Sequence, residues 1–564
     1  MKSRFPWLVL LLVWGLIILV VDPRGEFMVD DDWSFVKCLE AFRSTGTIGD
    51  TGWGPPGAPG GPALVVHLLV GDLFSRILGF SLTTLRIGVL TMGVLGSCGL
   101  LLLLRLAGAR PWPALLGTLA VVANPLFLAE CFTFMTDITF ACLAVFAILF
   151  LYLGVKKNSA SWIIGGFLLV LASILTRQIG AILLLAFWGA CWVHPRGAAL
   201  GRGKMLILGL VLVVLPWLAY ELLLSRLGST PVTSHGIIHN IFKFPREKWF
   251  WDYLGLLING FVFFGCGYLG FSLSPLLFGD LISRRSTRFF RYFLPAFALG
   301  AVLLEAAIIS GLFKPPVIFL GNVVNDYGIG PILLKDVYIL KIPRLPVISR
   351  EAYYLLVSWA ALGAVVLLAL FISFIRRWLK TRGEGEDAAN TFLLWMMFLA
   401  APGYLGIITL TWYHDRYLIS LLIFLVIWLS VYHLGSPGSE SIWKILPGFA
   451  MVIGLGIWSV CQVHDFMALK ASQKTAHDFA LQTLKVNPCD MDGGFEFNGY
   501  HCYRNDLRSS PGLSWWWVSR EDYLLTLGPL TGYRVVRVFP FRRYSGPPGA
   551  IHLLQPLRGD IPGG

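Results

Sequence analysis

The chain has 564 residues, of which 56% are hydrophobic and only 14% are charged. Soluble globular proteins carry roughly 45–50% apolar and about 25% charged residues, so this composition excludes a disordered chain and argues against a soluble enzyme. The net charge of +13 does not indicate nucleic-acid binding, because the Lys and Arg residues lie in short clusters between apolar runs. We therefore interpret the chain as an all-α polytopic membrane protein.

Apolar runs recur along the chain, and about 20 such residues cross a bilayer. The run 63–80 contains His67, Asp72 and Arg76. Ionisable groups are costly at the bilayer centre, so we expect this run to lie on the membrane surface. The other runs predict about 13 transmembrane helices, near 7–21, 86–104, 112–129, 138–155, 161–175, 179–193, 205–224, 253–278, 293–312, 352–375, 391–411, 417–434 and 444–461.

The basic clusters between these runs predict the orientation. If 63–80 does not span, all of them fall on one side, which the excess of positive charge on inner loops assigns to the cytoplasm. The N-terminus is then inside and the C-terminus outside, in what we interpret as the bacterial cytoplasmic (inner) membrane. The clusters are Arg105/Arg110, Lys156/Lys157, Arg196/Arg202/Lys204, Arg284/Arg285/Arg288/Arg291 and Arg376/Arg377/Lys380/Arg382.

Three parts of the chain are expected. Residues 1–230 form a membrane module with an acidic first outer loop, and residues 231–461 add further spans and outer loops. Residues 462–564 are polar and rich in Gly and Pro, which predicts a small extracytoplasmic α/β domain. It contains a helix-like stretch over 465–485 and strand-like pieces such as Tyr533-Arg-Val-Val-Arg-Val-Phe.

Two cysteines, Cys489 and Cys502, fall in this exported tail. In an oxidising compartment they either form a disulfide or remain free thiols.

The segment Met28-Val-Asp-Asp-Asp-Trp-Ser-Phe directly follows the first span. Three adjacent carboxylates repel one another, which should raise the pKa of at least one. They lie at the membrane surface, where a lipid-borne substrate presents its head group. We expect Asp31 and Asp32 to be functional and Asp30 to be solvated. The alternative is a solvated acidic turn without a chemical role.

Further polar residues lie at the outer ends of later spans. Asp137 is a candidate site residue, although an Asp after Thr is often a helix cap. Arg177 and Gln178 lie in an outer turn, where the guanidinium fork suits phosphate. The alternative for Arg177 is snorkelling to the interface.

A second outer arginine, Arg416, stands in the segment Trp412-Tyr-His-Asp-Arg-Tyr-Leu, beside His414 and Tyr417. An aromatic-belt residue with a salt bridge is the alternative. Two carboxylate sites and two arginines on one face indicate phosphate binding beside general-base chemistry.

Several short motifs, taken in order, resemble the GT-C superfamily of integral-membrane glycosyltransferases. The nearest branch is glycosyltransferase family 39-like, of the protein O-mannosyltransferase and aminoarabinose-lipid A transferase type. The resemblance is good over residues 5–230 and loose beyond. The motifs are Asp31-Asp-Trp-Ser, Thr84-Leu-Arg-Ile, Phe134-Met-Thr-Asp, Thr176-Arg-Gln and Asp415-Arg-Tyr-Leu.

The resemblance implies a GT-C fold and inverting transfer from a polyprenyl-phosphate sugar to an envelope lipid, glycan or protein outside the membrane. It implies that Asp31 or Asp32 acts as the general base. Charge neutralisation at the lipid phosphate then falls to Arg177 and Arg416. The remaining substrate-binding candidates are Asp137, Gln178, His414 and Tyr417.

No equivalent of the metal ligands of some relatives is evident, so a divalent metal requirement is left open and no cofactor is assigned. The alternative function is a polytopic transporter or flippase of lipid-linked glycans. It is disfavoured because the ionisable groups gather at one face and no inverted repeat with broken helices is evident.

Overall fold

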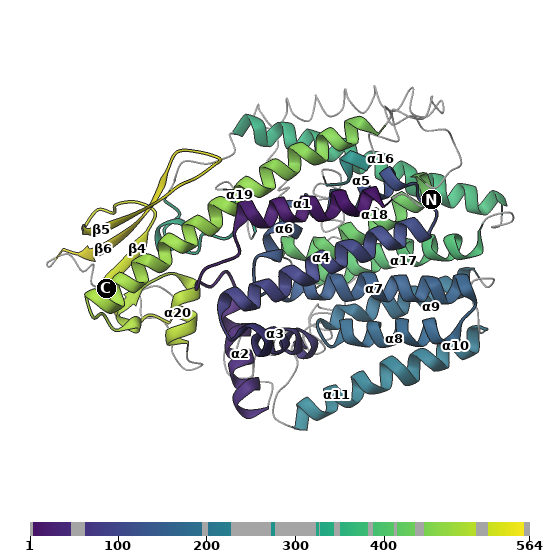
Figure 1. Ribbon diagram of the computed structural model, residues 1–564, viewed down its shortest axis with the longest axis horizontal. Coiled ribbons are helices and arrows are strands. Elements are labelled where there is room, and N and C mark those ends of the chain that lie inside the picture. The colour runs from purple at the N-terminus through teal and green to yellow at the C-terminus, as the bar shows by residue number, and fades with distance from the viewer. Residues whose placement is uncertain are drawn as a thin grey trace, which may run out of the picture.

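The computed structural model describes residues 4–46, 63–194, 201–226, 272–276, 323–325, 328–342, 350–381, 387–410, 414–434, 445–503 and 517–557. Most of the long helices run side by side along the long axis of the molecule, whereas the short helices α2 and α20 run across it (Figure 1). They are α1 (Phe5–Val21), α2 (Asp32–Thr45), α3 (Val65–Leu78), α4 (Leu82–Leu106), α5 (Pro111–Val122), α6 (Pro125–Cys131), α7 (Thr136–Lys157), α8 (Ala160–Ile174), α9 (Ala181–Val193), α10 (Arg202–Gly209), α11 (Leu215–Arg226), α16 (Arg350–Thr381), α17 (Ala388–Leu410), α18 (Leu418–Leu434), α19 (Leu446–Asp478) and α20 (Phe495–Cys502).

Local sequence signals set several helix starts. The Ser81 hydroxyl accepts a hydrogen bond from the Thr84 N–H at 3.1 Å and caps α4. Asn124 caps α6 in the same way through the Leu126 N–H, and Pro125 occupies the first helical position. These caps fix the first residues of both helices.

Within the described part of the chain, six helices are long and apolar enough to cross a membrane. The predicted all-α polytopic fold class with a small C-terminal α/β domain is confirmed, whereas the count of about 13 spans is not tested, because several runs lie outside the described residues. The run 112–129 is not one straight span: α5 and α6 are bent by 67° at Ala123-Asn124. The surface helix expected at 63–80 is the 14-residue α3, which is shorter than a span.

The stretch expected to be helical at 465–485 is helical as part of α19, which continues without a break to Asp478 and then as a π-helix to Thr483. The boundary expected at 461/462 therefore falls inside one helix. That helix carries the end of the bundle directly into the C-terminal domain (Figure 1).

The C-terminal domain packs a four-stranded sheet, in the order β3-β4-β6-β5, against the end of α19. Leu469 and Ala476 of α19 share its buried core with Leu525 and Leu553 of the sheet. Cys489 and Cys502 form a disulfide, so the paired alternative is the correct one. The strands are β3 (Met491–Asp492), β4 (Tyr523–Thr526), β5 (Tyr533–Phe541) and β6 (Gly549–Pro556); a separate hairpin pairs β1 (Val324–Asn325) with β2 (Gly328–Ile329).

Candidate active site

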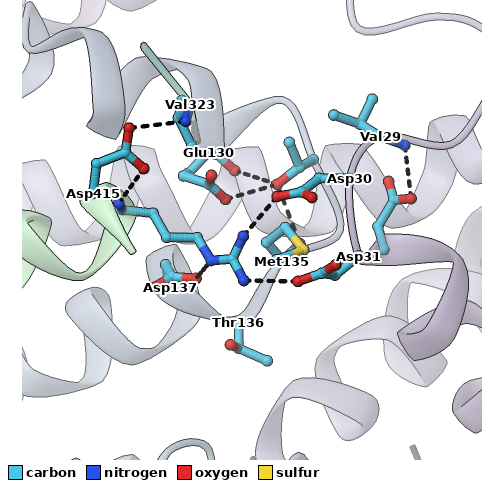
Figure 2. A network of polar contacts seen from close by, with 12 residues as sticks. Val29, Asp30, Asp31, Glu130, Met135, Thr136, Asp137, Val323 and Asp415 are labelled. Atoms are coloured by element: carbon cyan, nitrogen blue, oxygen red, sulfur yellow. Dashed lines mark hydrogen bonds and ion pairs between the residues drawn. The ribbon is translucent and has the colours of Figure 1, made fainter. Parts of the chain in front are cut away.

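Four segments meet around the side chain of Arg416. Three of its carboxylate neighbours, Asp30, Asp31 and Asp137, are labelled in the polar network of Figure 2. Its Nη1 lies 2.6 Å from an Asp30 carboxylate oxygen, and its Nη2 lies 2.7 Å from Asp31. Its Nε lies 3.7 Å from Asp137. The side chain is only 6% exposed, and a buried cation of this kind requires partners. The tertiary fold therefore brings three carboxylates from distant segments onto one arginine.

Arg416 is held in place by its neighbour Asp415. One Asp415 carboxylate oxygen accepts the backbone N–H groups of Val323 and Val324 at 2.8 and 3.1 Å. The other accepts the Arg416 N–H at 2.9 Å. The short helical turn η6 (Asp415–Tyr417) is thereby fixed to the β1–β2 hairpin. Asp415 thus has an anchoring role rather than the surface salt bridge weighed from the sequence.

The second arginine, Arg177, pairs with Asp137 in the first turn of α7. A carboxylate in a first helical turn is also stabilised by the helix dipole. The guanidinium carbon of Arg177 lies 4.3 Å from the Tyr417 ring centroid, and that of Arg416 lies 5.7 Å from it. Arg177 is therefore not snorkelling to an interface, and both arginines share one aromatic neighbour.

Among the three acidic residues, Asp32 is the most buried, at 2% exposure. One of its oxygens accepts the Val29 N–H at 2.7 Å, and burial raises its pKa well above the ordinary value. Asp31 is the accessible member, with 20% of its side chain exposed. The structure thus gives the two candidate bases different environments.

The expectation that Asp30 is solvated is wrong. Asp30 is 5% exposed and binds Arg416. Its pKa is raised, first by burial and then by the neighbouring charge of Asp31. The partner lies 386 residues away in the chain, so no local pattern could have revealed it.

The arginine of the Thr84-Leu-Arg-Ile motif positions the first outer segment. Arg86 is 2% exposed and donates to the carbonyls of Pro23 at 2.6 Å and Phe27 at 2.8 Å. Glu26, in the same segment, accepts the Leu82 N–H at 2.9 Å at the start of α4. The motif therefore sets the path of the chain from α1 to the acidic turn.

The structure adds three residues that the sequence analysis did not single out. Glu130 is 2% exposed at the end of α6 and lies beside Asp30 and Asp415 in Figure 2. In the sequence, the only indication of its role is that this acidic residue directly follows the apolar run 112–129. Glu496 and Lys470 of the C-terminal part are each 3% exposed and pair at 2.5 Å.

The remaining predicted residues lie at the margin of the network. The His414 ring packs edge-on against Tyr417, with centroids 5.3 Å apart. Burial, aided by Arg416 and Arg177, lowers the pKa of His414 to about 3, so this imidazole is neutral at physiological pH. Gln178 is half-buried in the 3-10 turn that precedes α9, and among the described residues its Nε2 has no hydrogen-bond partner.

Among the residues that the structure describes, no group of three or more His, Cys, Asp or Glu side chains is arranged to hold a metal ion. The described carboxylates at the site are instead engaged with arginines and backbone N–H groups.

Part of the chain is similar to a known protein family. Residues 62–220 match the model of the dolichyl-phosphate-mannose-protein mannosyltransferase family. No curated protein matches the chain.

Two crystal structures of ArnT from Cupriavidus metallidurans align over 97% of this chain and 97% of theirs, at 16% identity. One is in the apo state, with a TM-score of 0.37, and the other is bound to undecaprenyl phosphate, with a TM-score of 0.36. A likeness at these scores carries no argument about this site.

The family match contains Arg86, Asp137 and Arg177, which the GT-C resemblance had singled out. Residues 62–220 are thus similar to the dolichyl-phosphate-mannose-protein mannosyltransferase family, in keeping with the resemblance that the order of the motifs indicated.

Proposed function

We propose that this protein transfers a sugar from a polyprenyl-phosphate-linked donor to an envelope lipid, glycan or protein acceptor at the outer face of the membrane. The observation that carries the proposal is the convergence of Asp30, Asp31 and Asp137 on the buried Arg416. A buried cluster of carboxylates and arginines at one end of the bundle suits a phosphate leaving group beside a general base.

In this proposal Asp31 is the general base. It is more exposed than Asp32, whose oxygen is engaged with the Val29 N–H. Asp31 removes the proton from the acceptor hydroxyl as that oxygen attacks the sugar C1, and the lipid phosphate leaves from the opposite face with inversion. General-base help of this kind contributes typically ~10²–10⁴-fold. Asp32 holds the acidic turn in shape.

Arg177 and Arg416 supply positive charge for the leaving phosphate. Both lie near Tyr417, and both are paired with carboxylates in this structure. Binding of a donor phosphate adds negative charge to a buried site, and this added charge must be offset. Asp30 suits that role, because burial already favours its protonated form. Its protonation would release one face of Arg416 for the phosphate.

The reaction can be tested with the purified full chain reconstituted with an undecaprenyl-phosphate sugar. Transfer should release undecaprenyl phosphate, and the Asp31→Asn/Asp32→Asn double variant should abolish that release at normal expression. Near-normal release by the double variant would remove this mechanism. Transport of the intact lipid-linked sugar without release would instead establish the flippase alternative.

We propose that the site faces away from the cytoplasm, as the basic clusters predict. A reporter that is active only outside the cytoplasm should be active after Leu557 and inactive after Asn158. The reverse pattern would overturn the orientation. Glycan analysis of a deletion strain would then identify the acceptor.

A further inference from the structure

The acidic turn makes a second set of contacts, on its side facing the C-terminal part. The backbone N–H of Asp30 donates to Glu496 Oε1 at 3.1 Å. The same oxygen accepts from Lys470 Nζ at 2.5 Å. Asp30, Glu496 and Lys470 are each at most 5% exposed. An ion pair from the C-terminal part is therefore buried directly against the backbone of the proposed site.

The elements that carry this ion pair are firmly held. Glu496 lies in the first turn of α20, whose last residue, Cys502, is joined to Cys489 by the disulfide. The Phe495 N–H donates to the Leu333 carbonyl at 3.1 Å. Lys470 lies on α19, which is continuous with the bundle. The ion pair thus links two rigid elements to the turn.

A close approach of α2 to α20 reinforces this link. The Trp33 indole packs on Gly499, where an added Cβ would lie 2.4 Å from Trp33 Cε2. That distance excludes any larger residue without movement of one helix, so Gly499 is required by contact rather than by backbone conformation. Trp33 directly follows Asp32. The C-terminal part therefore contacts the acidic turn at both ends, at the Asp30 N–H and at Trp33.

A cavity of about 290 Å³ lies on the other side of this ion pair. Phe27 and Met28 of the first outer segment line it, together with Lys470 and Glu496. A loop that borders a cavity lacks packing support there. On this side the ion pair adds a polar contact to the turn, beside those that Arg86 makes with Phe27 and that Arg416 makes with Asp30.

We propose that Glu496 and Lys470 are positioning residues of the transfer site, which hold the acidic turn 29–32 against Arg416 through the backbone of Asp30. The C-terminal part then completes the active site rather than serving as a separate appendage. The inference rests on the proposed function for its consequence on turnover, but its geometric content does not depend on that function.

The geometric content can be tested by hydrogen–deuterium exchange of the full chain in lipid nanodiscs. Glu496→Met removes the acceptor of the Asp30 N–H and should speed exchange in peptides covering 28–31 by about tenfold or more, as expected for loss of a hydrogen bond to a charged group. Glu496→Gln retains an acceptor oxygen and should lie between wild type and Glu496→Met. Unchanged exchange in Glu496→Met would overturn the inference, whatever the enzyme transfers.

The consequence for turnover is read from kinetics. Misplacing a reacting group by ~1 Å costs on the order of 100-fold, so Glu496→Gln and Lys470→Met should each lower kcat by about 10- to 100-fold with little change in donor KM. Lys474→Met is the matched control: Lys474 lies one turn further along α19 and pairs with Asp478 instead. Normal kcat in both test variants would overturn the inference.

The acid side of the pH–rate profile separates positioning from general loss of structure. Glu496 raises the pKa values of both Asp30 and Asp32. Its neutralisation in Glu496→Gln should therefore move the acid limb, which belongs to the coupled cluster, to lower pH. Lys470→Met should not move it down, and Lys474→Met should leave it unchanged. The charged groups facing these carboxyls are Asp31, Asp32, Glu130, Arg416 and Glu496 around Asp30, and Arg86, Lys470 and Glu496 around Asp32.

The two possible failures are distinguishable. Absence of sugar transfer by wild type, with faster exchange in Glu496→Met, would remove the proposed function and leave the structural role intact. Transfer by wild type, with unchanged exchange and normal kcat in the variants, would support the proposed function and remove the positioning role of Glu496 and Lys470.

Discussion

The positively charged side chains at the two ends of α7 lie in opposite environments. At its last turn, Lys156 and Lys157 are exposed: Lys156 donates to the Leu106 carbonyl at 2.6 Å, and Lys157 lies 4.6 Å from the Trp162 ring centroid. At its first turn, Asp137 meets Arg177 and Arg416, whose side chains are 14% and 6% exposed. The charges at the first of these ends are exposed, whereas those at the second are buried and paired with protein carboxylates.

This contrast shows which charges should matter for chemistry. Exposed charges contribute about 0–1 kcal/mol each, and their sign chiefly sets the orientation in the membrane. Breaking a buried pair costs about 3–5 kcal/mol, because the remaining charge is left uncompensated. Equivalent substitutions at the two ends should therefore differ sharply, and the predictions below test that difference.

The largest effect is expected for Asp31→Asn, which keeps the size of the side chain but removes its basicity. Turnover should fall by ~10²–10⁴, or roughly 3–5 kcal/mol in the barrier, with donor binding little changed. Release of undecaprenyl phosphate is the measurement. Asp22→Asn is the control, because Asp22 pairs with Arg24 at the surface of the same segment. Equal losses in the two variants would contradict the assignment of Asp31.

A smaller effect is expected for Arg416→Lys, which keeps the charge but loses the planar guanidinium fork that we propose contacts the donor phosphate. Losing one charged hydrogen bond costs ~1.5–3 kcal/mol, so donor binding should weaken by about 10- to 100-fold. Equilibrium binding of undecaprenyl phosphate measures it. Arg24→Lys, at the exposed pair, should bind normally; normal binding by Arg416→Lys would show that charge alone suffices.

The Asp32→Asn variant tests the cost of a buried carboxylate. Burial raises the pKa of Asp32 in the folded protein, so its contribution to stability is full below the unfolded pKa of about 3.9 and is lost as pH rises through the raised pKa. Asn does not ionise, so the variant loses no stability at this position as pH rises. The variant should therefore melt above wild type at neutral pH, and the difference should shrink on acidification.

Apparent Tm at a fixed scan rate, followed across pH in nanodiscs, gives this difference. A variant that melts below wild type at every pH would show that the Asp32 charge stabilises the fold. The burial argument would then fail at this residue.

The smallest effect is expected at the other end of α7. Lys157→Gln removes an exposed charge stacked on Trp162, and surface changes of this kind usually alter stability by less than about 0.5 kcal/mol. Turnover and Tm should both stay close to wild type. A marked loss of turnover would contradict the comparison, because it would place chemistry at the end of α7 where the charged side chains are exposed.

Much of the framework could be predicted from the sequence. Apolar runs locate α4, α7 and α17 to within a few residues, because a helix that crosses lipid must satisfy its own backbone and present apolar side chains throughout. The candidate arginines and Asp137 also follow from sequence, since a charge interrupting such a run is conspicuous. The bend between α5 and α6 was less visible, as Asn124-Pro125 interrupts an otherwise continuous apolar stretch.

The sequence by itself determined that this is a membrane-embedded helical protein with acidic and basic residues at span ends, because hydropathy and charge are local properties of the chain. Only the tertiary structure decided how those residues meet. Asp30 looked solvated and is buried on Arg416, while Glu496 gave no signal and lies against the backbone of Asp30. Such contacts join residues hundreds of positions apart, and their energy exists only once packing has removed the water around them.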